Sequence, residues 1–325
     1  MDKALEILSL VIYFVTFILG LPANIFVLYV FYKKARSRLT PNLIYMINLC
    51  VSDLIFIAFL PVKIIATFYK QWSLPPLLCP IYQFFHFSTI YASVYFLTSV
   101  SVGRYLGAAY PIMYKIYKKP KYSFCISIGL WFFVIGHSSF AIFLETKYGT
   151  NDTLFVKETD DGLECYENFT QEQLAILVPV RLELSIVLFL VPLAVTIFCY
   201  ARCILILMQS RMHAAQKKKA IRVAVITVAI FILCFAPYNV SHVVGFVKWE
   251  NVWWRREALL PSTCNAFLDP LIFYFLSSAV DKGVVHFWKS LQKTYISTKH
   301  RLSSVFGEEV VNAKPQIATT LSTAI

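Results

Sequence analysis

The chain has 325 residues, of which 58% are hydrophobic and 15% are charged. A soluble domain carries about 25% charged residues, so the composition argues against a soluble globular protein. The net charge of +12 would suit a nucleic-acid-binding protein, but the basic residues lie in loops between apolar stretches, which argues against a nucleic-acid partner.

Seven apolar stretches predict membrane-spanning helices, since about 20 apolar residues cross the hydrocarbon core of a bilayer. The windows free of charged residues are 7–32, 54–62, 71–103, 122–144, 184–201, 223–247 and 258–268. Only Asp53 and Asp269, each embedded in continuing apolar sequence, shorten the second and seventh windows. We therefore predict an all-α membrane protein built as a seven-transmembrane helix bundle.

The loops between the spans alternate in charge, and this alternation predicts their orientation. Basic residues follow spans one and three and lie between spans five and six, whereas the long loop between spans four and five is acidic. Because basic loops remain in the cytosol, we expect a plasma-membrane protein with its N-terminus outside and its C-terminus in the cytosol. The basic loops would then meet anionic lipid of the inner leaflet and a cytosolic partner.

We expect four segments: an extracellular N-terminus over 1–6, the seven-transmembrane domain over 7–280, an amphipathic helix over 281–294 and a disordered cytoplasmic tail over 295–325. Segment 281–294 places apolar side chains on one side and lysines opposite, which is typical of a helix at the membrane face. The tail is polar and rich in Ser and Thr. The first span is expected to be retained as a signal-anchor.

The outer side carries two cysteines and two sequons. Cys79, at the start of span three, and Cys165, in the acidic loop, fall in the oxidising compartment and are expected to form a disulfide. Asn151 and Asn168 each begin an Asn-X-Thr sequon on that loop and are expected glycosylation sites.

Three basic residues stand at the outer ends of the last three spans: Arg181, His242 and Arg255. A charge at the edge of a hydrocarbon span is costly and needs a partner or a function. Guanidinium groups recognise carboxylates at two points, so the set predicts a site for a small carboxylate. The alternatives are structural: Arg255 could extend to lipid headgroups, Arg181 could pair with Glu183 or an acid of the loop, and His242 could be an ordinary interior histidine.

Asn24, Asp53 and Asp269 are the polar groups nearest the middle of the membrane. Two carboxyls and an amide there indicate either a hydrated, ion-holding core or a structural hydrogen-bond network.

A series of short motifs resembles the rhodopsin-like (class A) G-protein-coupled receptors, from span one to the segment after span seven. The motifs in chain order are Gly20-Leu-Pro-Ala-Asn24, Leu49-Cys-Val-Ser-Asp53, Cys79, Gly103-Arg104-Tyr105, Trp131, Pro192, Tyr200, Cys234-Phe-Ala-Pro237 and Asp269-Pro-Leu-Ile-Phe273. The resemblance implies that one set of residues forms the activation switch: Asn24, Asp53, Arg104, Tyr200, Phe235 and Asp269.

The chain departs from the class A pattern at Gly103. This glycine replaces the acidic residue that normally restrains Arg104, and its presence predicts raised signalling without ligand.

Further motifs narrow the resemblance to the free fatty acid receptor family, most closely its short-chain (type 2) branch. They are Ser88-Thr-Ile-Tyr91, Cys165-Tyr-Glu-Asn-Phe169, Val178-Pro-Val-Arg-Leu-Glu-Leu184, Pro237-Tyr-Asn-Val-Ser-His-Val243 and Trp253-Trp-Arg255. By resemblance, Arg181, His242 and Arg255 hold the carboxylate with help from Tyr238. Four further residues would line or cover the pocket: Tyr91, His137, Tyr166 and Glu167.

The resemblance implies a cell-surface receptor for short-chain fatty acids (acetate, propionate and butyrate). Its expected partners are heterotrimeric G proteins of the Gi/o and Gq/11 classes, with receptor kinases and arrestin acting on the Ser/Thr-rich tail. The chain shows no catalytic constellation or metal-ligand set, so we expect neither an enzyme nor a cofactor. Two alternatives stay open: a receptor for another acidic ligand, such as a hydroxy acid, a nucleotide or a longer fatty acid, and a carboxylate carrier.

Overall fold

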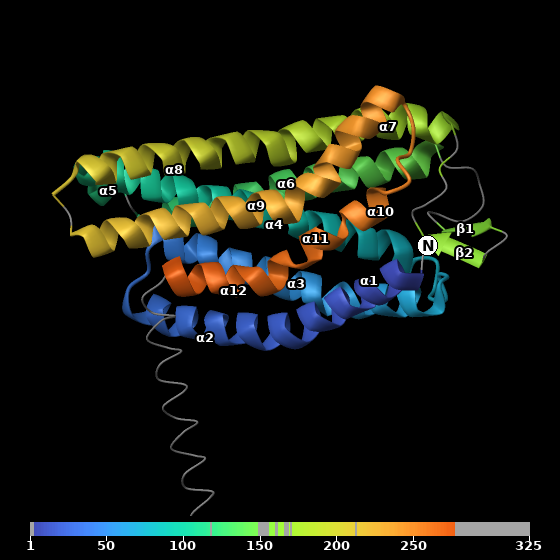
Figure 1. Cartoon of the computed structure of the whole chain (residues 1–325), viewed down its shortest axis with the longest axis horizontal. Helices are drawn as coiled ribbons and strands as arrows, with labels where there is room; N and C mark the ends of the chain where they lie inside the picture. Colours follow the sequence, from blue (N-terminus) through green and yellow to red (C-terminus); the bar gives the residue numbers. More distant parts are fainter. Residues whose placement is uncertain are drawn as a thin grey trace, which may run out of the picture. The chain divides into compact units, whose positions relative to one another are not determined.

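The computed structural model describes residues 3–117, 119–148, 156–159, 162–165, 169, 171–211 and 213–276. Helices make up nearly all of this part of the chain (Figure 1). In chain order the elements are α1 (Lys3–Val15), η1 (Thr16–Gly20), α2 (Leu21–Ser37), α3 (Pro41–Tyr69), α4 (Leu78–Ala109), α5 (Pro111–Tyr117), α6 (Pro120–Tyr148), β1 (Val156–Thr159), β2 (Gly162–Cys165), α7 (Gln171–Ser185), η2 (Ile186–Leu190), α8 (Val191–Gln209), α9 (Ala214–Lys248), α10 (Arg255–Ala258), α11 (Leu260–Thr263) and α12 (Asn265–Leu276). The predicted segments 281–294 and 295–325 lie outside the described residues.

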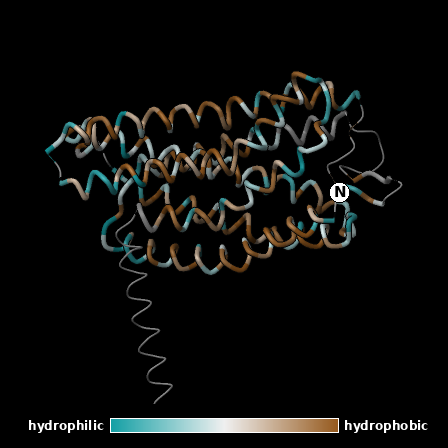
Figure 2. Tube along the Cα trace, in the orientation of Figure 1, coloured by the Kyte–Doolittle hydropathy of each residue, from teal (hydrophilic) through white to brown (hydrophobic). Residues whose placement is uncertain are grey.

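Within the described residues, five continuous helical stretches are long and apolar enough to cross a membrane. They run over Lys3–Ser37, Pro41–Tyr69, Pro120–Ser139, Gln171–Gln209 and Ala214–Lys248. The 32-residue helix α4 occupies the place of the predicted third span, and the seventh span is divided into the short helices α10, α11 and α12. The hydrophobic colours of Figure 2 follow the middle of the long helices, and the hydrophilic colours gather near their ends.

The outer surface of these helices is apolar, as a lipid-facing surface must be. Large side chains are strongly exposed in the middle of spans, among them Ile18 (63%), Phe132 (73%) and Leu233 (68%). Such a surface would be unstable in water. It is the expected exterior of a protein whose backbone polar groups are satisfied inside helices while lipid surrounds it.

Polar side chains connect the helices inside the bundle. The Ser52 hydroxyl of α3 donates to the Thr89 carbonyl of α4 at 2.8 Å, and the Trp131 indole of α6 donates to Asn48 Oδ1 of α3 at 3.0 Å. The hydroxyls of Thr98 and Thr196 join α4 to α8 at 3.0 Å. Interhelical hydrogen bonds of this kind are typical of helices packed in a membrane, where no water competes for the polar groups.

Two features of the spans were not expected from the sequence. Spans one and five each contain a π-helical turn, η1 and η2, between two α-helical parts. In addition, α1 begins at Lys3, earlier than the expected boundary at residue 7. Glu6 of this helix pairs through its carboxylate with Nζ of Lys70, the residue that follows α3, at 2.6 Å.

Candidate functional site

Three basic side chains from distant parts of the chain line one small cavity among α7, α9 and α10. Arg181 comes from α7, His242 from α9, and Arg255 from the first position of α10. Their exposed fractions are only 6%, 3% and 8%, so none of them extends freely to the surface. The structure thus brings together the three residues that the sequence predicted to act as a set.

The two arginines lie against the same aromatic ring. The guanidinium carbon of Arg181 is 4.9 Å from the centre of the Phe169 ring, and that of Arg255 is 5.8 Å from it. Both distances are within the range of cation–π attraction. Phe169 follows the disulfide-bonded Cys165 by four residues and belonged to a motif noted in the sequence, but its role as a platform for two arginines was not predicted.

A second unpredicted contact fixes the Arg181 side chain. Arg181 Nη1 donates a hydrogen bond of 3.1 Å to Asn251 Oδ1, in the turn between α9 and α10. Glu183, one of the acids expected as a partner of Arg181, lies 3.4 Å from His137 Nδ1 of α6 instead. The turn after α9 thus helps to hold Arg181 in place through a neutral amide.

The cavity has a strongly positive lining. Among the described residues, Glu250 is the one acid that lines it. The Glu250 carboxylate is half-exposed and lies 3.7 Å from Lys248 Nζ. An exposed pair of this kind contributes little to the field inside the cavity. A small anion would therefore be attracted by two buried guanidinium groups, with the His242 imidazole as a further hydrogen-bond donor or acceptor.

Aromatic side chains pack beside His242. The rings of Tyr238 and His242 are one helical turn apart on α9, and their centres are 4.3 Å apart with nearly perpendicular planes. Phe87 of α4 stacks on Tyr238 at 5.7 Å. Tyr91 is buried one turn further along α4. Among the described residues, the Nδ1 atom of His242 has no hydrogen-bond partner.

The free space among the basic residues is about 10 Å³, which is room for about one water molecule. A bound carboxylate must therefore displace the lining side chains to some extent.

His137 does not join this cavity. Its Nδ1 lies 3.4 Å from Glu183 Oε1, and its ring packs edge-on against Phe133 at 4.6 Å. His137 and Glu183 line a shallow apolar groove between α6 and α7 on the outside of the bundle. In this structure His137 lies beside α7 and apart from the arginine cavity, so its place in the ligand pocket stays a prediction. Tyr166 and Glu167, predicted to cover the pocket, lie outside the described residues.

The outer hairpin is joined to the bundle. A disulfide connects Cys79, at the start of α4, with Cys165, the last residue of β2, as the sequence predicted. The backbone N–H of Trp72 also donates to the Leu163 carbonyl at 2.6 Å. These contacts hold the hairpin against the outer ends of α3 and α4. The predicted glycosylation sites Asn151 and Asn168 lie outside the described residues.

The predicted polar centre is assembled and fully buried. Asn24 Nδ2 donates to the carbonyls of Gly20 at 3.0 Å and Ala266 at 2.6 Å, which ties span one to span seven. The carboxyl of Asp53 receives a 3.5 Å hydrogen bond from Ser93, and that of Asp269 receives one of 3.0 Å from Asn265. Asn24 Oδ1, Asp53 Oδ2 and Asp269 Oδ1 are buried and have no hydrogen-bond partner among the described residues. The polar centre is therefore only partly satisfied, and both the ion-holding core and the structural network stay predictions.

The remaining predicted switch residues lie toward the inner part of the bundle. Arg104 is partly buried, and its Nε atom has no hydrogen-bond partner within the part of the chain that the structure describes. Tyr200 of α8 is buried, and so is Phe235 of α9, which packs edge-on against Phe231 at 5.6 Å.

Residues 23–274 match the sequence family described as 7 transmembrane receptor (rhodopsin family). The chain belongs to this family. The match covers the predicted spans from Asn24 onward and confirms the prediction of a seven-transmembrane helix bundle. Membership of this family means that the chain is a multi-pass membrane protein and a receptor, and not an enzyme.

Individual relatives narrow the assignment. The chain is 41% identical to free fatty acid receptor 2 of Mus musculus over 279 residues, which cover 85% of this chain and 83% of that protein. It is also 41% identical to free fatty acid receptor 3 of Mus musculus over 268 residues, 82% of each chain. Free fatty acid receptor 1 of Mesocricetus auratus is 34% identical over 281 residues, 84% of this chain and 93% of that protein. The receptor is therefore a member of the free fatty acid receptor family.

Proposed function

We propose that this receptor binds a short-chain fatty acid (acetate, propionate or butyrate) on the outer side of the plasma membrane and activates heterotrimeric G proteins on the inner side. The observation that carries the proposal is the convergence of Arg181, His242 and Arg255, all buried, on one cavity. The names of the relatives support fatty acids as the ligand class.

The small cavity favours the short-chain acids within that class. Burial of a methylene contributes about 0.8 kcal/mol, so a ligand of two to four carbons gains little from apolar contact. Its affinity comes mainly from charge-assisted hydrogen bonds to the arginines, each of which contributes about 1.5–3 kcal/mol. We therefore expect weak binding that depends on the carboxylate and tolerates small changes in the tail.

The orientation and the intracellular partners are part of the same proposal. The basic loops support an orientation with the N-terminus outside and the C-terminus in the cytosol. The resemblance to the family supports coupling to Gi/o and Gq/11. The Ser/Thr-rich tail, which lies outside the described residues, is the proposed substrate of receptor kinases and docking segment for arrestin.

The test is a concentration–response panel of straight-chain carboxylates, from formate to octanoate, in cells that express the receptor. The proposal expects a maximum of potency among acetate, propionate and butyrate, and no response to the corresponding amides. A maximum at octanoate or at a hydroxy acid such as lactate would instead support the alternative acidic-ligand receptor. Uptake of radiolabelled acetate without G-protein activation would support a carrier.

A further inference from the structure

A second cavity, separate from the arginine cavity, opens at the outer end of the bundle and has a volume of about 330 Å³. It lies among α1, α3, α4, β2 and the α10–α11 segment. Its size is at the lower end of the range found for small-molecule sites. The function proposed above makes no use of this cavity.

The lining of this outer cavity differs from that of the arginine cavity in its charge. It contains three acidic and three basic residues: Glu6, Glu164, Glu257, Lys63, Lys70 and Arg256. A purely anionic or purely cationic ligand would meet groups of its own sign there. A ligand that carries both signs can place each charge beside an opposite one.

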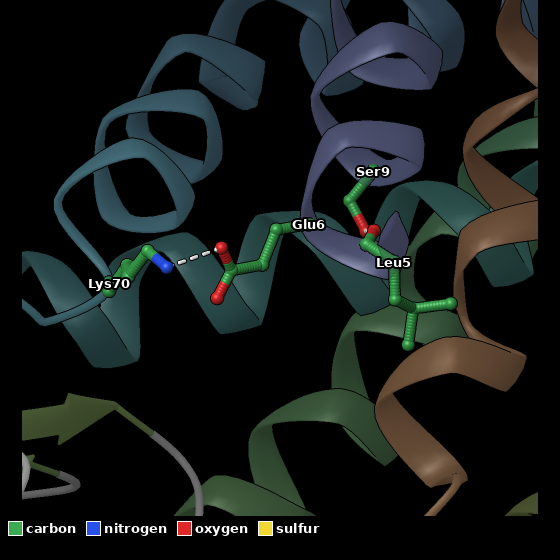
Figure 3. Close-up of polar contacts among 4 residues, drawn as sticks. All are labelled: Leu5, Glu6, Ser9 and Lys70. Atoms are coloured by element: carbon green, nitrogen blue, oxygen red, sulfur yellow. Dashed lines mark hydrogen bonds and ion pairs between the residues drawn. The ribbon is translucent and has the colours of Figure 1, made fainter. Parts of the chain in front are cut away.

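Two of these charged residues, Glu6 and Lys70, form an ion pair with each other. Figure 3 shows the Glu6 carboxylate of α1 directed at Lys70, the residue that follows α3. The two charged groups are 2.6 Å apart. On α1 the Ser9 hydroxyl donates to the Leu5 carbonyl at 2.7 Å, so it is occupied within its own helix. This ion pair forms part of the wall of the outer cavity.

Glu257 is the group that points to a ligand. Its Oε2 atom is buried and has no hydrogen-bond partner within the described ranges of the chain. A buried carboxylate oxygen without a donor is costly, and an ammonium group would supply both a hydrogen bond and an opposite charge. Lys63 and Arg256 in the same lining provide positive charge for the anionic end of a ligand.

The short helix α10 contributes residues to both cavities. Arg255 lines the arginine cavity, whereas the next two residues, Arg256 and Glu257, line the outer cavity. Consecutive side chains on a helix point in different directions. One helix of four residues therefore presents recognition groups to two cavities.

We propose that the outer cavity is a second binding site, for a small zwitterion that places an ammonium group on Glu257 and an anionic group near Lys63 and Arg256. This site does not depend on the carboxylate function proposed above. A compound such as β-alanine, which is propionate with an added ammonium group, has the required chemistry.

The experiment is a saturation-transfer NMR titration of β-alanine against the purified full-length receptor in lipid nanodiscs, with propionate and propylamine as singly charged controls. The measurement uses the Arg181→Ala receptor as well as the wild type, so that binding at the arginine cavity is separated from binding at the outer cavity. The control for the loss of an acid is Glu172→Gln, because Glu172 is an exposed acid of α7 that lines neither cavity.

We expect β-alanine to bind the wild-type and Arg181→Ala receptors alike and more tightly than propylamine. Glu257→Gln should weaken that binding by at least about tenfold, since it removes a charge-assisted contact, while Glu172→Gln should leave it unchanged. Binding of β-alanine that disappears in Arg181→Ala, survives in Glu257→Gln, or is absent from the wild type would overturn the second site. Loss of propionate binding in Arg181→Ala with β-alanine binding retained would support both sites separately.

Discussion

The side-chain oxygen of Asn42 lies where the Cβ atom of any larger residue at Gly103 would stand. Asn42 belongs to the first turn of α3 and accepts a hydrogen bond of 3.5 Å from the Tyr114 hydroxyl of α5. The missing side chain before Arg104 therefore makes room for a contact that connects the inner ends of α3, α4 and α5.

This packing predicts that Gly103→Ala destabilises the receptor although alanine favours helices. The added Cβ must displace Asn42, at a cost of about 1–3 kcal/mol for an overpacked site. Gly107→Ala is the matched control on the same helix, because its Cβ would meet Tyr114 at an ordinary 3.5 Å. Thermal unfolding of the purified receptors should show a lower midpoint for Gly103→Ala only. Equal midpoints for the two variants would contradict the close contact.

The same contact changes how the raised basal signalling predicted from Gly103 must be tested. A glutamate at position 103 can pair with Arg104 only after Asn42 has moved, so the informative comparison uses the Asn42→Ala background. There, Gly103→Glu should lower ligand-independent G-protein activation, since about 1.4 kcal/mol shifts a two-state population tenfold. Gly103→Gln is the uncharged control. Equal basal activity of the Glu and Gln variants at matched surface levels would show that the missing acid is not the cause.

Phe169 should contribute to ligand response through the two arginines that it contacts. Phe169→Leu keeps an apolar side chain but loses the aromatic face, and a cation–π contact contributes about 0.5–2 kcal/mol. We expect propionate potency to fall about threefold to tenfold in Phe169→Leu and to stay near wild type in Phe169→Tyr. Concentration–response curves at matched surface expression provide the measurement. Identical curves for the Leu and Tyr variants would remove Phe169 from the site.

The disulfide between Cys79 and Cys165 should be required for a correctly folded outer face. Loss of a native disulfide typically costs about 2–5 kcal/mol in small secreted domains, and here it would release the hairpin from α4. We expect Cys165→Ser to reduce surface expression or the response to propionate, whereas Cys125→Ser, which removes a free cysteine, should not. Peptide mapping of surface-expressed receptor without reduction should recover the two cysteines in one linked pair, and two free thiols would contradict the structure.

The spans were predictable from the sequence because charged residues are rare in the apolar windows. For the same reason the three basic residues at the ends of the spans, Arg181, His242 and Arg255, could be recognised as a candidate site. The direction in which a side chain points on a uniformly apolar helix was not predictable. His137 is the example: α6 has apolar residues on all sides, so its sequence does not show which face meets the bundle. Contacts between distant segments, such as Asn251 with Arg181, depend on tertiary packing and leave no local pattern.

The most direct test of the carboxylate site is the propionate concentration–response of G-protein activation in wild-type, Arg181→Ala, Arg255→Ala and His137→Ala receptors at matched surface levels. The account predicts that each arginine variant loses at least about tenfold in potency, because each arginine contributes a charge-assisted contact of about 1.5–3 kcal/mol. His137→Ala should stay within about twofold of wild type, since this histidine faces Glu183 across a partly exposed pair outside the cavity. Unchanged potency in Arg255→Ala, or a loss in His137→Ala as large as in the arginine variants, would contradict the site.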